Sequence, residues 1–522
     1  MSQIDLSTQL EQAKLLLQRG KIIDAIEFCR NCLALKSEFL PMSLLLNQAY
    51  QLNSQFDLML SHAKELAESY SDNPVIQIRL VECLIYSGEI AEAIKNIDRL
   101  FQRAGSNSSF LSKLGELYLH CCQHQKVFEC HQKAYKINPD DCTNIYNLAA
   151  AQINLGQFDS ARKLLDKVIE KNKSDFDPFY NRSAILKADK ENNNIEQLLS
   201  QLKWNRNNPL ATCPIAYALG KEYEDIGEFE KAFYYLDIAA KSRRRRMQYQ
   251  VDTDVEVMNQ IRKTYSKEKL SRVSVSNSND SPIFIFGLPR SGTTLVERIL
   301  SSHSSVESLG EINSLAFSIM HSVGPNLGKI DLVRKSININ FDWLASRYKS
   351  ATAGYGFNAR YLIDKTPLNF LYLGIIKLAF PKAKVIHISR DPMDSCYAMY
   401  KTLFRMGYPF SYELSDLGHY YIAYSELMKH WDDLFGKQIF HIQYERLVEN
   451  PAAEIEALLE YCQLSWEDSV LSFYNKKSPV ATASAIQVRQ PIYRSSVGRW
   501  KKYEEQLKSL KCQLENSGIC CD

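Results

Sequence analysis

The fold of the C-terminal half of the chain is decided by the stretch Phe286-Gly287-Leu288-Pro289-Arg290-Ser291-Gly292-Thr293-Thr294-Leu295. A short apolar run, Ile283-Phe284-Ile285, precedes it and is typical of a buried strand. Apolar residues at 295, 296, 299 and 300 then follow with the spacing of one helix face. A strand, a glycine-bearing loop and a helix in this order direct backbone N–H groups and the positive end of a helix at an anion. The stretch therefore predicts an anion-binding loop.

The two glycines of this loop, Gly287 and Gly292, have the spacing of a Walker A loop. In a Walker A loop a lysine follows the second glycine, whereas here Thr293 does, and the basic residue of the loop is Arg290. We therefore expect a phosphate-like ligand without ordinary hydrolysis of ATP or GTP. A P-loop kinase stays open as an alternative, although we see no obvious apolar strand that ends in aspartate.

The composition is that of a globular chain long enough for several domains, with 522 residues, of which 24% are charged, and a net charge of +3. This small charge gives no argument for a nucleic-acid or membrane partner. No apolar run approaches the roughly 20 residues that span a bilayer, and the first residues lack the pattern of a secretion signal. We therefore expect a cytoplasmic protein. Most of the 13 cysteines lie at helix-like apolar positions, and the adjacent pairs Cys121-Cys122 and Cys520-Cys521 are not C-x-x-C pairs with matching histidines, so we expect reduced thiols and no metal site.

The N-terminal half repeats with a period of 34 residues. The positions that mark the period are Gly20, Ser54, Gly88, Cys122 and Gly156, and a further copy contains Gly227. Paired helices with a small residue at the turn make this pattern resemble the tetratricopeptide repeat over about residues 6–242. The fourth unit is degenerate, because Cys122 and His124 replace the usual glycine and aromatic residue.

Stacked repeats of this kind form a superhelical array with a concave groove. We expect the groove to bind an acceptor protein or peptide, while a rigid spacer or a dimerisation surface stays open. Four arginines, residues 243–246, follow the last repeat. We interpret them as a solvated or acid-paired helix end that helps to join the domains. The oligomeric state cannot be predicted from these patterns.

From residue 281 onward, strand-like and helical segments alternate, which predicts an α/β domain with a parallel sheet. A second strand, residues 384–389, leads into Arg390, and a third, residues 438–443, leads into Tyr444. Ligands of open α/β sheets collect beyond the C-terminal ends of the strands. We therefore expect Arg290 and Arg390 to face one anionic ligand.

Three segments in this order, residues 287–294, 390–392 and 496–500, resemble the sulfotransferases that use 3′-phosphoadenosine 5′-phosphosulfate (PAPS). The resemblance covers about residues 281–505, and the tyrosylprotein sulfotransferases match the spacing best. It implies a multidomain chain with an N-terminal all-α tetratricopeptide-repeat solenoid and a C-terminal α/β, P-loop-like sulfotransferase domain. The expected bounds are 1–245 for the repeat array, 246–280 for a helical connector and linker, 281–510 for the sulfotransferase domain and 511–522 for a C-terminal tail.

The resemblance also implies a set of donor-binding residues. The 5′-phosphosulfate would be held by Arg290, Ser291, Gly292, Thr293 and Thr294, the 3′-phosphate by Arg390, and the rest of the nucleotide by Tyr444, Ser484, Gln487 and Arg499. The family has a serine eight residues after the second arginine, and this chain has Ala398 there. That departure puts the 3′-phosphate contact in question. The product would be 3′,5′-ADP, and the reaction needs no metal.

The same resemblance implies three catalytic residues. Glu311, 21 residues after Arg290, would take the proton of the acceptor, Lys365 would stabilise the leaving oxygen, and Arg290 would stabilise the transferring group. Two alternatives stay open. Glu311 could be a structural carboxylate, and Lys365 could be a surface lysine paired with Asp364. His303 is a rival base that we expect to end the helix of the loop.

The function that these residues imply is transfer of a sulfuryl group to an acceptor hydroxyl, with tyrosine, saccharide and small-molecule acceptors all open. A second hypothesis is a nucleotide-binding scaffold that has lost catalysis. Ala398 supports the scaffold, whereas Arg290, Glu311 and Lys365 speak against it.

Overall fold

A computed structural model of the chain describes residues 6–404, 407–476, 478–482 and 484–521. The chain forms two compact units. The first unit contains Met1–Arg103, Ser276–Ser278 and Asn313–Gly356, and the second contains Ala104–Val275, Asn279–Ile312 and Phe357–Asp522. The expected end of the repeat array at residue 245 lies inside the second unit.

The first unit is helical. Its helices are α1 (Leu6–Gln18), α2 (Ile22–Leu35), α3 (Leu40–Leu52), α4 (Phe56–Ser69), α5 (Pro74–Tyr86), α6 (Ile90–Arg103), α18 (Ser314–Val323), α19 (Lys329–Ser336) and α20 (Phe341–Ala353). The first six form pairs in which α1, α3 and α5 begin at residues 6, 40 and 74, so the 34-residue period is confirmed. The turn inside each pair contains a residue with left-handed backbone, with φ of 74° at Gly20, 56° at Ser54 and 76° at Gly88.

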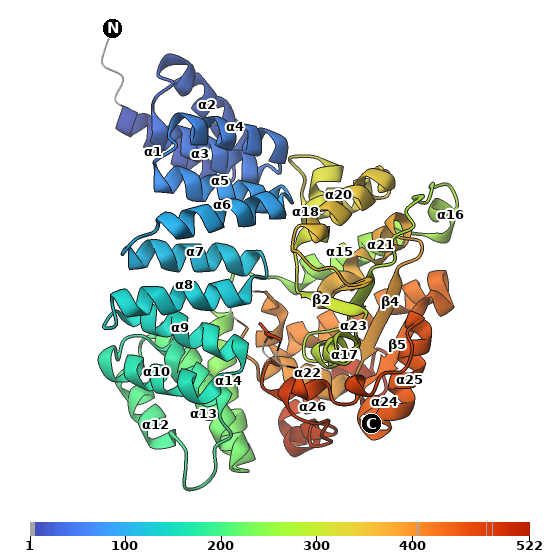
Figure 1. Cartoon of the computed structure of the whole chain (residues 1–522). Helices are drawn as coiled ribbons and strands as arrows, with labels where there is room; N and C mark the ends of the chain where they lie inside the picture. Colours follow the sequence, from blue (N-terminus) through green and yellow to red (C-terminus); the bar gives the residue numbers. More distant parts are fainter. Residues whose placement is uncertain (1–5, 405–406, 477, 483, 522) are drawn as a thin grey trace. The chain divides into compact units, whose positions relative to one another are not determined.

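The second unit also has a helical part (Figure 1), whose helix pairs begin at residues 108, 142, 177 and 209, close to the same period. It comprises α7 (Ser108–His120), α8 (His124–Ile137), α9 (Cys142–Leu155), α10 (Phe158–Lys171), α11 (Asp177–Ile185), α12 (Ile195–Trp204), α13 (Pro209–Asp225) and α14 (Phe229–Arg244). The degenerate unit keeps the same turn, because Cys122 adopts the left-handed conformation with φ of 56°. The expected connector follows as α15 (Val251–Thr264) and α16 (Lys267–Leu270). At the end of α14, Arg244 Nε lies 2.8 Å from Asp416 Oδ2, which confirms an acid-paired helix end.

The second unit also contains a five-stranded parallel sheet. Its strands are β1 (Ile283–Phe286), β2 (Val306–Gly310), β3 (Tyr361–Asp364), β4 (Lys384–Ser389) and β5 (Ile439–Gln443). They lie in the order β2-β3-β1-β4-β5, and every neighbouring pair is parallel. The predicted α/β domain with a parallel sheet is therefore confirmed, although β2 and β3 were not predicted as strands.

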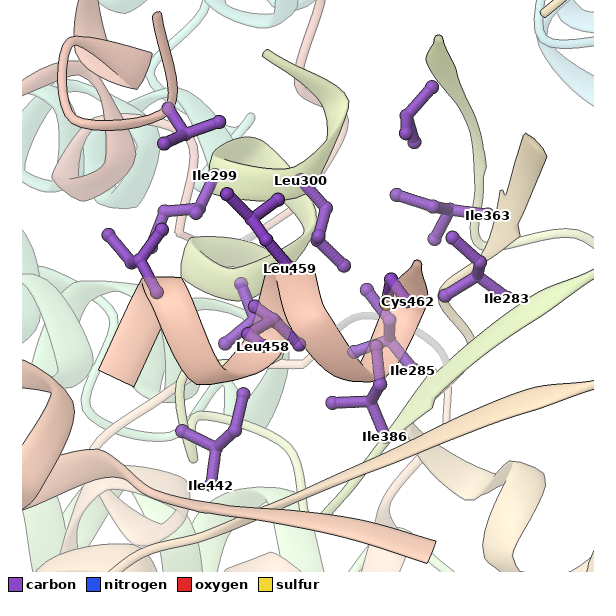
Figure 2. Close-up of a cluster of buried hydrophobic side chains, with 14 of the residues drawn as sticks. Ile283, Ile285, Ile299, Leu300, Ile363, Ile386, Ile442, Leu458, Leu459 and Cys462 are labelled. Carbon is purple, nitrogen blue, oxygen red and sulfur yellow. The ribbon is translucent and has the colours of Figure 1, made fainter. Parts of the chain in front are cut away.

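Further helices of this unit are α17 (Thr293–Ser301), α21 (Leu373–Ala379), α22 (Pro392–Tyr400), α23 (Leu414–Phe435), α24 (Tyr444–Glu449), α25 (Pro451–Cys462) and α26 (Glu504–Glu515). Alternate residues of a strand face the same side of a sheet, so Ile283 and Ile285 of β1 point to one face. There they share a buried cluster with Leu300 of α17 and with Leu459 and Cys462 of α25 (Figure 2). This apolar layer holds α17, and with it the loop that precedes it, against the sheet.

In the described part of the chain, no helix is both long and apolar enough to cross a membrane. Within those same residues, no group of three or more His, Cys, Asp and Glu side chains is placed to hold a metal ion.

Candidate active site

Five sequence-predicted segments follow directly on the five strands. Glu311 comes after β2, Lys365 after β3, the loop from Gly287 after β1, Arg390 after β4 and Tyr444 after β5. Because all five strands are parallel, these residues lie at the same edge of the sheet, and strands that neighbour one another are about 4.8 Å apart. The topology thus brings the residues implied for chemistry next to those implied for donor binding.

The loop between β1 and α17 has glycine where the backbone comes closest to its neighbours. A Cβ on Gly287 would lie 2.3 Å from the carbonyl oxygen of Ile388. A Cβ on Gly292 would lie 2.7 Å from Cδ2 of Tyr444, and this glycine also has φ of 108°. Both positions therefore exclude a side chain, and the loop is packed against β4 and the start of α24.

Arg290 occupies the middle of this loop in a conformation that a non-glycine residue rarely adopts, with φ of 69°. Its Nη1 donates to the Ser484 hydroxyl, and its Nη2 donates to Gln487 Oε1 at 2.8 Å. Burial lowers the pKa of the Arg290 guanidinium. Strain of this kind is found where a functional geometry is held by its surroundings, and here two predicted donor-binding residues hold it.

Three buried polar atoms around the loop have no hydrogen-bond partner among the described residues. They are Nε of Arg290, Oγ of Ser291 and Nε of Arg390. Buried donors are normally paired, so three such atoms at the end of a sheet indicate a site for an external acceptor. Because two of them belong to guanidinium groups and α17 begins at Thr293, the site fits an anion such as a phosphate or phosphosulfate.

Arg390 is fixed on several sides. Its Nη1 donates to the carbonyl oxygen of Arg290 at 3.2 Å, and its Nη2 donates to that of Ser496 at 2.5 Å. Its guanidinium lies over the ring of Tyr444, 5.0 Å from the centroid, and the Tyr444 hydroxyl is 2.7 Å from Ser496 Oγ. Tyr444 therefore positions Arg390 through its ring and through its hydroxyl.

The next two loop residues, Thr293 and Thr294, are buried in the first turn of α17. The Thr294 hydroxyl lies 3.5 Å from that of Thr482, which belongs to the segment that carries Ser484. The structure thus keeps Thr294 beside the loop that covers Arg290.

Glu311 and Lys365 form an ion pair, with 2.5 Å between Oε1 and Nζ. The side chain of Lys365 is 0% exposed and that of Glu311 is 40% exposed. Glu297 of α17 is a second partner, with its Oε2 3.5 Å from Lys365 Nζ. Burial favours neutral Lys365, but Glu311 and Glu297 outweigh it and raise the pKa of this lysine. The interpretation of Lys365 as a surface lysine is therefore wrong, because the side chain is buried between two carboxylates.

Arg499 has a different environment from the other predicted donor-binding residues. Its Nε lies 3.5 Å from Oε1 of Glu224, a residue of α13, and its guanidinium lies 6.0 Å from the centroid of the Phe229 ring. Among the described residues, its side-chain hydrogen bond goes to Glu224 and not to Arg290 or Arg390. Glu224 also contacts Lys401, whose Nζ is 2.8 Å from Glu224 Oε2. Sequence reasoning missed both Glu224 and Lys401.

The segment that carries Ser484 and Gln487 is attached to the repeat helices. The backbone N–H of Val480 donates to the carbonyl oxygen of Asn154 at 2.9 Å, and Nη2 of Arg489 donates to the same oxygen at 3.0 Å. Ile486 packs on a buried cluster that contains Ala149, Ala161, Leu165 and Ile185. The segment whose Ser484 and Gln487 contact Arg290 therefore packs against the end of α9.

Two histidines belong to the interior rather than to the chemistry. His303 is buried, with its Nε2 3.1 Å from the carbonyl oxygen of Ser465 and 3.4 Å from Glu467 Oε1. His387 is buried in β4, with its Nε2 2.5 Å from the Tyr424 hydroxyl. The position of His303 agrees with the expectation that it is not the base.

The sequence of the C-terminal half matches a known family. Residues 282–468 match the model of the Sulfotransferase family. Protein-tyrosine sulfotransferase 1 of Danio rerio is 24% identical over 255 residues, which are 45% of this chain and 69% of the relative. An uncharacterised protein of Aquifex aeolicus (strain VF5) is 31% identical over 445 residues, 83% of this chain. The match spans 58% of that relative's length.

Solved structures of both kinds of fold are similar to parts of the chain. The sulfotransferase domain from the Synechococcus PCC 7002 olefin synthase has 19% identity and a TM-score of 0.33, and covers 44% of this chain and 91% of its own. A tetratricopeptide repeat protein from Parabacteroides merdae has 13% identity and a TM-score of 0.33, and covers 47% of this chain and 93% of its own. These TM-scores are low, so the fold assignment rests on the helix period, the parallel sheet and the family match. Residues 282–468 thus match the sulfotransferase family, and they follow a helical array with the period of the tetratricopeptide repeat.

Proposed function

We propose that the protein is a PAPS-dependent sulfotransferase that forms 3′,5′-ADP and a sulfated acceptor. The observation that carries this proposal is the order of groups along the sheet. The Glu311–Lys365 pair lies at the ends of β2 and β3, next to the loop after β1, whose buried donors lack partners among the described residues. A proton-accepting group beside an anion site is the arrangement that group transfer to a hydroxyl requires.

The donor would be held by the loop and the strand ends. Arg290, Ser291 and the first backbone N–H groups of α17 provide donors for the phosphosulfate, and Nε of Arg390 provides one for the second phosphate. Ser484 and Gln487 keep Arg290 directed at the site. When bound, PAPS supplies the sulfuryl group and a phosphate leaving group.

We propose that Glu311 takes the acceptor proton. Its carboxylate is 40% exposed, so an acceptor hydroxyl can reach it, while Lys365 holds one of its oxygens. Glu311 accepts the proton as the acceptor oxygen forms its bond to sulfur and the bond between sulfur and the phosphate oxygen breaks. Lys365 and Arg290 offset the negative charge that grows on the leaving oxygen and on the transferring group.

The acceptor class is proposed from the relatives. Because a relative from Danio rerio is named a protein-tyrosine sulfotransferase, we propose peptide tyrosine as the first acceptor to test. We further propose that the repeat array binds the acceptor or a partner protein, as tetratricopeptide arrays do with peptides.

The test has two parts. The first is titration calorimetry with 3′,5′-ADP, for which we expect saturable binding by the wild-type protein. The second is transfer of labelled sulfate from PAPS to pools of tyrosine peptides, glycans and small hydroxyl compounds, with Glu311→Ala as the inactive control. Absence of 3′,5′-ADP binding would contradict the whole proposal, whereas binding without transfer to any pool would favour the inactive scaffold.

A P-loop kinase predicts binding of ATP with Mg²⁺ instead. The structure corrects one argument against it, because β3 does end in an aspartate, Asp364. That side chain is buried and accepts hydrogen bonds from Thr366 and Asn369. Thr293 in place of the Walker A lysine stays the main argument against a kinase.

A further inference from the structure

Glu224, near the end of repeat helix α13, is a buried carboxylate with four donors around it. Tyr397 and Tyr503 donate their hydroxyls to its Oε1 at 2.7 and 3.0 Å. Lys401 donates to its Oε2 at 2.8 Å, and Nε of Arg499 lies 3.5 Å from its Oε1. Burial opposes ionisation of Glu224, but Lys401 and Arg499 prevail and lower its pKa to about 2. The group is therefore a carboxylate at neutral pH.

One carboxylate thus holds two cations that belong to the C-terminal half. Lys401 and Arg499 would repel each other without Glu224, and together they carry one positive charge more than it neutralises. Both remain accessible, because 26% of the Lys401 side chain and 30% of the Arg499 side chain are exposed. Among the described residues, Arg499 makes its side-chain hydrogen bond through Nε, which leaves its two terminal nitrogens to bind a ligand.

A second carboxylate, Asp394, ties Arg499 to the neighbourhood of Arg390. The backbone N–H groups of Gly498 and Trp500, on either side of Arg499, donate to the two oxygens of Asp394 at 2.6 and 3.1 Å. Asp394 Oδ2 is also 3.6 Å from Nη2 of Arg390. The backbone at Arg499 is therefore fixed beside the arginine that follows β4.

Lys401 is the C-cap residue of α22. It comes three residues after Ala398, the residue that departs from the family pattern. Burial, together with the charges of Arg499 and Arg290, opposes protonation of Lys401 and lowers its pKa despite the contact with Glu224.

We propose that Glu224 makes the repeat array part of the donor site, by positioning Lys401 and Arg499 as a cationic pair that binds the 3′-phosphate of the nucleotide. Lys401 takes over the contact that Ala398 cannot make. Glu224 itself is a positioning residue, because it acts on the ligand through the two cations. This inference rests on the proposed function, since it assumes a nucleotide with a second phosphate.

The experiment compares the affinities of 3′,5′-ADP and 5′-AMP, which differ only in the 3′-phosphate, by titration calorimetry on the full chain. The measured quantity is the dissociation constant of 5′-AMP divided by that of 3′,5′-ADP. We expect Lys401→Met and Glu224→Gln each to reduce this ratio about tenfold or more, because a hydrogen bond to a charged group is lost, while 5′-AMP affinity stays nearly unchanged. Lys401→Arg should restore most of the ratio.

Glu222→Gln is the matched control. Glu222 lies on the same helix, is buried, and accepts hydrogen bonds from Ser183 and Asn194 rather than from the cationic pair. Its replacement should lower the melting temperature as Glu224→Gln does, but leave the affinity ratio at the wild-type value. If Glu224→Gln does not fold, the affinity ratio of Lys401→Met tests the proposal by itself.

The outcomes separate the two proposals. If the wild-type protein does not bind 3′,5′-ADP, the proposed function itself fails. If it binds 3′,5′-ADP but does not prefer it to 5′-AMP, or if Lys401→Met keeps the wild-type ratio, the cationic pair is refuted and the proposed function stands. If Lys401→Met lowers the ratio while folded Glu224→Gln does not, the positioning role of Glu224 is refuted.

Discussion

Replacement of Glu311 by glutamine tests the catalytic assignment most directly, because the structure offers a second carboxylate for the same role. Both Glu311 and Glu297 contact Lys365, with 2.5 and 3.5 Å between the charged atoms. The Glu311 side chain is 40% exposed, whereas that of Glu297 is 12% exposed and accepts a hydrogen bond from Ser308 at 2.6 Å. An acceptor hydroxyl can therefore reach Glu311 more easily than Glu297.

The magnitudes follow from these contacts. Loss of a general base slows transfer about 10²–10⁴-fold, so we expect a loss of this size for Glu311→Gln. Removing one partner of a buried ion pair costs about 3–5 kcal/mol, but Glu297 stays beside Lys365, so we expect a destabilisation of roughly 1–2 kcal/mol. That loss lowers the melting temperature by only a few degrees, and 3′,5′-ADP affinity should change less than about threefold.

The assay is initial-rate transfer of labelled sulfate from saturating PAPS, combined with thermal unfolding and calorimetry of the same preparations. Glu297→Gln is the matched control, because it also removes one carboxylate from Lys365 and keeps the proposed base. We expect it to be destabilised to a similar extent and to keep turnover within about tenfold of wild type. If Glu297→Gln abolished transfer while Glu311→Gln retained it, the assignment of the base would be refuted.

Three further predictions concern the donor loop, the Glu224 network and the repeat turns. Gly292→Ala should weaken 3′,5′-ADP binding at least tenfold in calorimetry, because the new methyl would lie 2.7 Å from the Tyr444 ring at φ of 108°; unchanged affinity would contradict the close approach. Glu224 has a pKa of about 2 in the folded chain and an ordinary value of 4.5, so its pairing stabilises the fold above about pH 4.5 and is lost as the pH falls toward 2. The difference in unfolding free energy between wild type and Glu224→Gln, measured in urea, should accordingly shrink by about 3 kcal/mol over that interval, and a pH-independent difference would exclude the shift. Ser54→Gly should stabilise the chain by about 0.5–1 kcal/mol in denaturant unfolding, because Ser54 has a left-handed backbone with φ of 56°, and a destabilisation would refute that reasoning.

The repeat array and three of the five strands could be predicted from sequence because their signals are local and strong. The 34-residue marks fall on the turns of the helix pairs, including Cys122, where the residue type gives no hint of left-handed backbone. The strands β2 (Val306–Gly310) and β3 (Tyr361–Asp364) escaped prediction. β2 has only two fully buried residues, and β3 ends in Asp364, so neither is a continuous apolar run like the four residues of β1.

The candidate site could be predicted where residues lie inside motifs, as Arg290 and Arg390 do. Glu311 and Lys365 were placed by family resemblance alone, and their ion pair, like the second partner Glu297, became visible only in three dimensions. Glu224 was missed because 177 residues separate it from Lys401, and a single glutamate near the end of a repeat helix resembles any other in sequence. Contacts between segments so far apart follow from the tertiary fold.

The attachment of Val480, Ile486 and Arg489 to the repeat helices has a consequence for any attempt to shorten the protein. A fragment that began at residue 281 would contain every sulfotransferase motif, yet it would lack the Asn154 carbonyl that holds Val480 and Arg489 and the apolar surface under Ile486. It would also lack Glu224, so Lys401 and Arg499 would repel each other without a counterion. We expect the donor site of such a fragment to be open and misassembled. The shortest variant that folds correctly should therefore retain the later repeats.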